Sequence, residues 1–263
     1  MDARGGDGIR VSRLILCPVL DSRGAGIVGS RSQEQHALLT DYDNTAAYSQ
    51  AFYTLFANIR FHWENEQRLP ADEKPTAPRV HTLLVTSASP YKDQATVAAN
   101  LAIVAAQSGA ETILVDANFR FPSICQRFGL KPGAGLSDLL EAGDVTPQKI
   151  ASCLQETFIP GLRILGTGSE STQGPALLLS PHLKMVATGL SELLAASEKQ
   201  SGLVIYHSAS VLSGADASLI GALTEQTVLT VIMGKTTRAQ AKQAQEQLEQ
   251  AHINLAGVIM LHP

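Results

Sequence analysis

Residues 80–107 read VHTLLVTSASPYKDQATVAANLAIVAAQ. The first seven, 80–86, are rich in apolar and β-branched residues, which is typical of a buried strand. After a loop, 96–107 consists almost entirely of Ala, Val, Leu and Ile and predicts a buried helix, which Ser108 and Gly109 end. A buried strand followed by a loop and a buried helix is the unit of a parallel α/β sheet.

The same alternation continues to the end of the chain. Further strands are expected at 111–116, 162–166, 202–207, 226–233 and 254–261, with helices near 137–155, 182–197, 214–224 and 236–251. Helices between strands favour a parallel sheet, because the crossover between parallel strands needs such a connection. The predicted fold class is α/β, with a doubly wound, predominantly parallel sheet and helices on both faces.

Four segments are expected along the chain. Residues 1–45 carry several Gly, Ser and Arg with little periodicity, which predicts a flexible N-terminal tail. Residues 46–66 are predicted to form an arm helix, with Ala51, Leu55 and Ile59 on one apolar stripe. Residues 67–79 are polar and contain three prolines, as a linker would. The α/β domain then occupies 80–263.

Composition excludes several classes of protein. The 263 residues carry a formal net charge of −4, so neither nucleic acid nor an anionic membrane is expected as the main partner. Cys17, Cys125 and Cys153 have no metal-binding or disulfide spacing, and no metal site is expected. No apolar run is long enough to span a bilayer. We therefore expect a cytoplasmic protein without direct membrane insertion.

Ligand sites in such sheets lie at the carboxyl ends of the strands, which directs attention to the loops after Thr86, Asp116 and His207. The first loop and the helix after it read TSASPYKDQATVAANLA over 86–102. This segment resembles the Walker A motif of the bacterial tyrosine kinases (BY-kinases) of capsule and exopolysaccharide synthesis, typically T-S-A-x-P-G-E-G-K-S-T-x-A-A-N-L-A. The resemblance implies a P-loop NTPase-type fold of the deviant-Walker kind, similar to MinD and the BY-kinases.

The resemblance covers 46–261 of the chain. LVDANFRFP at 114–122 is similar to the family's second acidic motif, L-I-D-A-D-L-R-R-P. GLSDLL at 135–140, IPGL at 159–162 and GKTTR at 234–238 match further family segments in the same order. By this order and spacing the chain is identified as a member of the family.

The departures from the family fall on the positions that hold nucleotide. Tyr91 and Asp93 stand where the family has glycines, which let backbone N–H groups approach phosphate. Gln94 replaces the phosphate-binding lysine, and Ala95 replaces the hydroxyl residue that binds magnesium. Lys92 could serve only in a shifted register. The vestigial nucleotide loop is thus Ala88, Tyr91, Lys92, Asp93, Gln94, Ala95 and Thr96.

The other two loops carry related changes. His207 stands where the family's Walker B aspartate holds a magnesium-bound water. In the second acidic motif Asn118 replaces the second aspartate, whereas Asp116 and Arg120 are retained. We expect Asp93, Asp116 and His207 to converge where the phosphates would lie, and to form a hydrogen-bonded His–Asp pair there in preference to a metal site.

These changes together predict that ATP and magnesium do not bind. A carboxylate such as Asp93 at about 4 Å from a phosphate charge costs on the order of 4 kcal/mol at an effective dielectric constant near 20. The missing lysine removes a favourable interaction of the same kind, and roughly 1.4 kcal/mol is a factor of ten in affinity. We expect no catalytic residue and no cofactor.

The arm helix also departs from the family. The family's Glu-x-x-Arg-x-x-Arg motif, used in ring assembly, falls on Gln50, Tyr53 and Phe56, so a ring of the family type is not expected. Two alternatives stay open: these residues contact a different partner, or the helix packs on its own core. None of the five tyrosines forms a C-terminal cluster of the kind that active members phosphorylate in trans.

The resemblance implies a non-catalytic cytosolic regulator in exopolysaccharide or capsule biosynthesis and export. Its expected partner is a membrane chain-length-determinant (Wzz-type) co-polymerase, which would recruit it to the inner membrane, together with an active kinase or polysaccharide-synthesis enzymes. One alternative is a weakly active, ATP-binding tyrosine autokinase that uses Lys92 and Asp116. The other is a MinD/ParA-like positioning ATPase, which the missing C-terminal amphipathic membrane helix disfavours.

Overall fold

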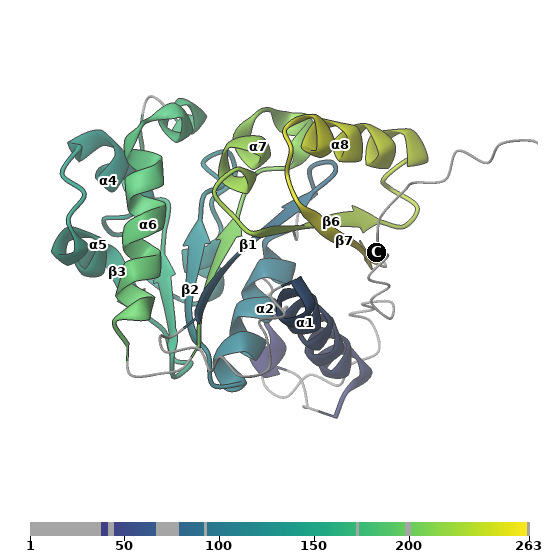
Figure 1. Cartoon of the computed structure of the whole chain (residues 1–263), viewed down its shortest axis with the longest axis horizontal. Helices are drawn as coiled ribbons and strands as arrows, with labels where there is room; N and C mark the ends of the chain where they lie inside the picture. Colours follow the sequence, from purple (N-terminus) through teal and green to yellow (C-terminus); the bar gives the residue numbers. More distant parts are fainter. Residues whose placement is uncertain are drawn as a thin grey trace, which may run out of the picture.

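A seven-stranded sheet forms the centre of the computed structural model, which describes residues 38–41, 45–66, 79–91, 94–171, 174–197 and 201–261. The strands lie in the order β3-β4-β2-β5-β1-β6-β7 (Figure 1). All neighbouring strands are parallel except β3 and β4. The strands are β1 (Arg79–Ser87), β2 (Glu111–Asp116), β3 (Leu154–Glu156), β4 (Leu162–Leu165), β5 (Ser201–His207), β6 (Gln226–Ile232) and β7 (Leu255–Leu261).

Helices cover both faces of the sheet (Figure 1). Because successive strand residues point to opposite faces, Leu83 and Val85 of β1 join one core and Leu84 joins the other. The first core is closed by α1 (Ala47–Glu66), α2 (Gln94–Gln107) and α3 (Ile124–Arg127). The second is closed by α4 (Leu136–Ala142), α5 (Pro147–Cys153), α6 (His182–Ala195), α7 (Asp216–Gly221) and α8 (Arg238–Gln250).

The predicted fold class is confirmed. Strand β1 lies inside the sheet between β5 and β6, and it is parallel to both. Every residue of α2 except Gln107 is buried, as its nearly continuous apolar sequence predicted. Among the described residues, no helix is both long enough and apolar enough to cross a membrane.

The region 137–155, expected as one helical segment, is divided into three elements. Helix α4 ends at Gly143, whose φ of 68° is the left-handed conformation that glycine adopts easily. Thr146 caps the next helix, α5, by accepting a hydrogen bond from the Lys149 N–H, and Pro147 occupies its first turn. The chain then forms β3, an antiparallel edge strand of three residues that is too short to give a sequence pattern.

The segment before the sheet is more closely packed than predicted. Most of the expected tail and linker, 1–37, 42–44 and 67–78, lies outside the described residues. Within the expected tail, however, Leu38 and Leu39 are buried, and the Leu39 N–H donates to Asn100 Oδ1 of α2 at 2.9 Å. The short 3-10 helix η2 (Leu39–Asp41) is therefore part of the folded domain.

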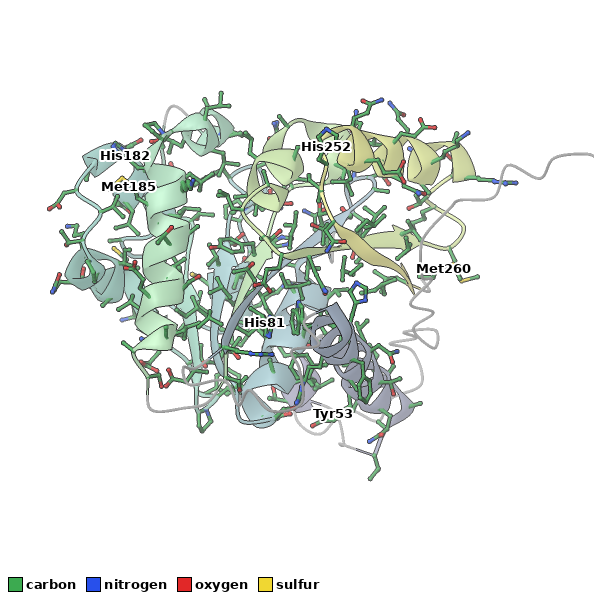
Figure 2. All side chains as sticks on the ribbon, in the orientation of Figure 1. Tyr53, His81, His182, Met185, His252 and Met260 are labelled. Carbon is green, nitrogen blue, oxygen red and sulfur yellow. The ribbon has the colours of Figure 1, made fainter. Side chains whose placement is uncertain are left out.

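Helix α1 matches the arm helix expected at 46–66, and it packs against α2. Of the three residues predicted for an interface, Phe56 is only 5% exposed and belongs to the core. Tyr53, labelled on α1 in Figure 2, donates from its hydroxyl to Gln107 Oε1 at 2.8 Å. Gln50 is exposed. For Phe56 the burial agrees with the second alternative, in which this helix packs on its own core.

Candidate functional site

The carboxyl ends of β1, β2 and β5 meet, as predicted. His207, the last residue of β5, is in register with Val85 of β1 and with Asp116 of β2. The Ala117 N–H donates to the His207 carbonyl at 2.8 Å, and Thr86 Oγ1 donates to the Ala209 carbonyl at 2.9 Å. The sheet thus places the three loops that follow these strands side by side.

The loop after β1 is tied to its neighbours at its start. Ala88 is fully buried; its N–H donates to the Thr230 carbonyl at 3.0 Å, and its carbonyl accepts from the Leu212 N–H at 3.2 Å. Tyr91 also reaches Thr230 of β6, with its hydroxyl 3.4 Å from Thr230 Oγ1. Lys92 and Asp93 lie outside the described residues. The backbone of Ala88 is therefore already used by β6 and by the 3-10 helix η4 (Val211–Ser213).

Gln94, in the lysine position, is buried at the start of α2. Its Oε1 accepts a hydrogen bond from Ser87 Oγ at 3.0 Å, so this oxygen is directed back to the end of β1. Ala95 is buried and offers only a methyl group. The hydroxyl of Thr96 is buried and has no hydrogen-bond partner among the residues that the structure describes. The start of α2 therefore presents one committed amide oxygen, one methyl group and one unsatisfied hydroxyl.

Asp116 holds the loop after β2 in shape. Its Oδ1 accepts from the Asn118 N–H at 3.2 Å, and its Oδ2 accepts from the N–H groups of Ser123 and Ile124, both at 3.0 Å. Complete burial raises the pKa of Asp116 from 3.8 to about 6, although these N–H groups and the charge of Arg127 act in the opposite direction. This carboxyl group is an anchor for the loop.

His207 is a buried, neutral imidazole. Burial lowers its pKa from 6.5 to about 3, and the positive charge of Arg127 adds to this effect. Its Nε2 lies 3.4 Å from Asn118 Nδ2, and its Nδ1 has no hydrogen-bond partner within the part of the chain that the structure describes. Of the two aspartates that the predicted His–Asp pair could use, Asp116 does not bind this imidazole, and Asp93 lies outside the described residues. The Asp116 carboxylate is taken up by backbone N–H groups, and Asn118 is the residue that contacts the imidazole.

Arg120 binds within the chain. Its Nε and Nη2 donate to the two carboxylate oxygens of Asp216 at 3.0 and 3.1 Å, which links the loop after β2 to the first turn of α7. The hydrogen bond with Asp216 raises the pKa of Arg120. Gly214 packs so closely that an added Cβ would lie 2.8 Å from Arg120 Nη2. The guanidinium is thus committed to an ion pair.

Sequence reasoning missed two charged residues of this region. Asp216 has no motif around it, and its pairing with Arg120 spans 96 residues of sequence. Arg127 is buried on α3 and influences both Asp116 and His207. Among the described residues, no three His, Cys, Asp or Glu side chains gather in a way that could hold a metal ion.

The chain has clear relatives among known proteins, although no family model matches it. It is 29% identical over 232 residues to the tyrosine-protein kinase YwqD of Bacillus subtilis (strain 168), covering 88% of this chain and 87% of that protein. It is 24% identical to the putative tyrosine-protein kinase CapB of Staphylococcus aureus, covering 81% of this chain and 83% of that one. The putative tyrosine-protein kinase EpsB of Ralstonia solanacearum is 30% identical over 67% of this chain. The matched region makes up 22% of the length of EpsB.

Solved structures give the same result. The chimerical protein CapA2B2 matches with a TM-score of 0.71 and 26% identity, over 90% of this chain and 94% of that one. The kinase domain of the Escherichia coli tyrosine kinase ETK matches with a TM-score of 0.69 and 22% identity, over 84% and 78%. The septum site-determining protein MinD of Pyrococcus horikoshii has a TM-score of 0.54 and 17% identity, over 69% and 70%.

The fold and the position of the three loops define a P-loop NTPase-type α/β domain. Within that class, the chain is a homologue of the bacterial tyrosine-protein kinases (BY-kinases) and shares the fold of their kinase domains.

Proposed function

We propose that this protein is a non-catalytic relative of the bacterial tyrosine kinases that regulates exopolysaccharide or capsule biosynthesis. The observation that carries the proposal is the hydrogen bond from Ser87 Oγ to Gln94 Oε1 at 3.0 Å, in the position where the family has its phosphate-binding lysine. A lysine there would place a positive charge beside the phosphates, whereas Gln94 is neutral and its oxygen is already occupied.

Two further residues at the nucleotide positions, Ala95 and His207, support the same proposal. Ala95 has no oxygen to offer magnesium. His207 is neutral, fully buried and next to Asn118, so it cannot replace a carboxylate that holds a magnesium-bound water. The side chains of Gln94, Ala95 and His207 therefore do not fit ATP with magnesium, and we derive no phosphoryl transfer from them.

The proposed partner is a membrane co-polymerase of the chain-length-determinant (Wzz) type, which would recruit this cytosolic protein to the inner membrane. Support for the pathway comes from relatives such as the putative tyrosine-protein kinase in the cps region of Klebsiella pneumoniae, 29% identical over 69% of this chain. The chain spans only 24% of that protein, so its activity and its partners come to this chain as proposals.

A nucleotide titration tests the loss of catalysis. We expect the wild-type protein to bind no fluorescent ATP analogue at millimolar concentration with magnesium, and to carry no phosphotyrosine after purification. A variant with Tyr91→Gly, Asp93→Gly, Gln94→Lys, Ala95→Ser and His207→Asp should bind measurably, because the sheet and the start of α2 that position these residues are intact. Gln94→Lys alone is the matched control and should not bind.

The opposite result is equally definite. Micromolar ATP affinity of the wild type that disappears on Lys92→Ala would show that the loop works in a shifted register, and the autokinase alternative would replace this proposal. A pull-down with the full chain tests the pathway. Recovery of a co-polymerase supports it, and recovery of division or chromosome-partition proteins instead would favour a positioning role.

A further inference from the structure

A large open cavity lies beside the candidate site, at the carboxyl ends of β2 and β4. Its volume is about 850 Å³, within the range of roughly 300–1,000 Å³ that is usual for small-molecule sites. Its described lining residues come from 116–133, from 166–171 and from Gly174. None of Gln94, Ala95 and His207 lines it, and Asp116 is the one residue that it shares with the candidate site described above. The cavity is therefore a separate place for a ligand.

One wall of the cavity is fixed by Asp138. Its carboxylate accepts hydrogen bonds from the N–H of Gly135 at 2.7 Å, the N–H of Ser169 at 3.1 Å and Ser169 Oγ at 2.8 Å. Partial burial alone would raise the pKa of Asp138, but these hydrogen bonds outweigh it and the pKa is lowered. Ser137 Oγ donates to the Ser169 carbonyl at 2.9 Å. The loop after β4 is thus held to the start of α4.

The opposite wall is fixed by Asp116 and Asn118. Asp116 accepts the three backbone N–H groups already described, and Asn118 Oδ1 accepts a fourth, from Phe121, at 3.1 Å. Two walls anchored independently by buried or half-buried side chains describe a site that is formed before its ligand arrives. Such preformation lowers the entropic cost of binding.

The chemistry of the lining selects the class of ligand. Among the described residues that line the cavity there is no Lys, Arg or His, whereas there are two carboxylates, Asp116 and Glu170. Among these lining residues a phosphate or carboxylate ligand would meet like charge and no cation. Hydroxyl and amide groups on Ser123, Thr167 and Gln126 can both donate and accept hydrogen bonds. The polar part of the site therefore suits neutral hydroxyl groups.

The same cavity has apolar surface. Phe119 and Leu130 line it, and both are partly buried against the two cores. Asp116 accepts hydrogen bonds from backbone N–H groups, and Glu170 is exposed to solvent. Neither carboxylate therefore needs a cation within the cavity. A ring with C–H groups on its faces and hydroxyl groups around its edge matches this combination of surfaces.

We propose that this cavity is a binding site for an uncharged, hydroxyl-rich ligand, namely a neutral sugar unit. It does not depend on the loss of nucleotide binding, because Gln94, Ala95 and His207 do not line the cavity. A sugar site on a regulator of the polysaccharide pathway would let the protein respond to the presence of glycan.

The test uses the full chain and two matched variants. Gly133 lines the cavity, and an added Cβ would have only Gln155 Nε2 near it, at an ordinary 3.6 Å, so Gly133→Phe should fill the cavity without a backbone clash. Lys131→Phe adds the same ring in the same loop at an exposed residue that does not line the cavity. The probes are methyl glycosides of glucose, galactose, mannose and rhamnose, with inorganic phosphate and spermidine as charged comparisons, followed by saturation-transfer NMR and calorimetry.

We expect at least one methyl glycoside to bind the wild type and the Lys131→Phe variant equally, and to lose at least tenfold in affinity with Gly133→Phe. Gln126→Ala should weaken the same sugar several-fold. The proposal is overturned if no glycoside binds the wild type at about 20 millimolar. It is also overturned if the Gly133→Phe variant binds the sugar as well as the wild type does, or if phosphate or spermidine competes with the sugar. Because ATP is not a probe, failure here leaves the nucleotide titration unaffected.

Discussion

The two loop regions at the carboxyl edge of the sheet differ in how they use charge. At the ends of β1 and β5, the groups in the nucleotide positions are buried and neutral: Gln94, Ala95 and His207. At the ends of β2 and β4, Asp116 and Asp138 each collect three hydrogen bonds and hold an open cavity. The described nucleotide positions of the first region are thus buried, whereas the second region lines an open cavity.

This difference separates two roles that sequence motifs do not distinguish. A retained acidic residue can be kept for loop geometry alone, since Asp116 has three backbone N–H groups to hold whether or not a nucleotide binds. A position that serves only phosphate or magnesium has no such second role, and Ala95 and Gln94 occur there without disturbing α2. The four experiments below test this division, from the largest expected effect to the smallest.

Substitution of Gly135 should have the largest effect, because it lies where the cavity wall is most tightly packed. An added Cβ would fall inside contact distance of the Gly166 carbonyl and the Gly168 N–H. We expect Gly135→Ala to lower the free energy of unfolding by about 3 kcal/mol. Gly133→Ala, two residues earlier and exposed, is the matched control and should change it by less than about 0.5 kcal/mol. Urea denaturation measures both; equal values would mean that this wall is not rigid.

The acid dependence of stability should separate His207 from Asp116. The folded pKa of His207 is depressed from 6.5 to about 3, so its contribution is lost as the pH falls below 6.5. The folded pKa of Asp116 is raised from 3.8 to about 6, so its contribution is present at low pH and lost as the pH rises through 6. Between pH 4 and 6 the two oppose each other, each at up to roughly 1.4 kcal/mol per pH unit.

Two substitutions should therefore tilt the pH profile in opposite directions. In the His207→Gln variant Asp116 is the one of the two groups that still titrates, and the free energy of unfolding should rise by about 1–2 kcal/mol from pH 6 to pH 4. In the Asp116→Asn variant His207 is the group that still titrates, and the free energy of unfolding should fall over the same pH range. Urea titrations at pH 4, 5 and 6 decide this. Parallel slopes in the two variants would show that one of the two groups titrates normally.

The Arg120–Asp216 pair joins the two regions, and its loss should have an intermediate effect. Arg120→Ala leaves the carboxylate of Asp216 buried without its bidentate partner, at an expected cost of about 1–2 kcal/mol after allowance for the partly exposed guanidinium. Arg120→Lys keeps the positive charge but not the two parallel hydrogen bonds of the guanidinium, and should recover only part of the lost stability. Lys242→Ala, which breaks an exposed i,i+4 pair with Glu246, is the control at less than about 0.5 kcal/mol.

Gln94 should be the least sensitive position. Gln94→Ala removes one hydrogen bond and leaves Ser87 Oγ without that acceptor, which we expect to cost about 1 kcal/mol in thermal or urea denaturation. Nucleotide binding should stay undetectable in the variant, as in the wild type. A gain of ATP binding would mean that Gln94 blocks a site that is otherwise competent.

The sequence predicted what apolar patterns and family motifs encode, and it failed where side-chain direction decides. Strands and α2 are long apolar runs, and the loops after Thr86, Asp116 and His207 meet because parallel strands share an edge. The Asn118–His207 contact depends on the directions of an amide and an imidazole side chain, which the spacing of residues along the sequence does not specify.

Three further features could not be predicted for related reasons. The sequence left open whether Phe56 contacts a partner or the core, and the rotation of α1, which buries it, decides this. Asp216 meets Arg120 across 96 residues of sequence, and no motif marks it. The cavity is formed by two separate loops, so it becomes visible only when the loops after β2 and β4 are placed together.

The interior position of β1 has a consequence for how the protein is made. β1 leaves the ribosome early, with the apolar α2 directly behind it, yet its neighbour β5 begins at Ser201, more than a hundred residues later. At a synthesis rate of about 5–20 residues per second, this apolar strand and helix wait on the order of ten seconds before the sheet can close on both sides of β1. During that interval the apolar surface of β1 and α2 lacks its partner strand, and pauses in translation before residue 201 would prolong its exposure.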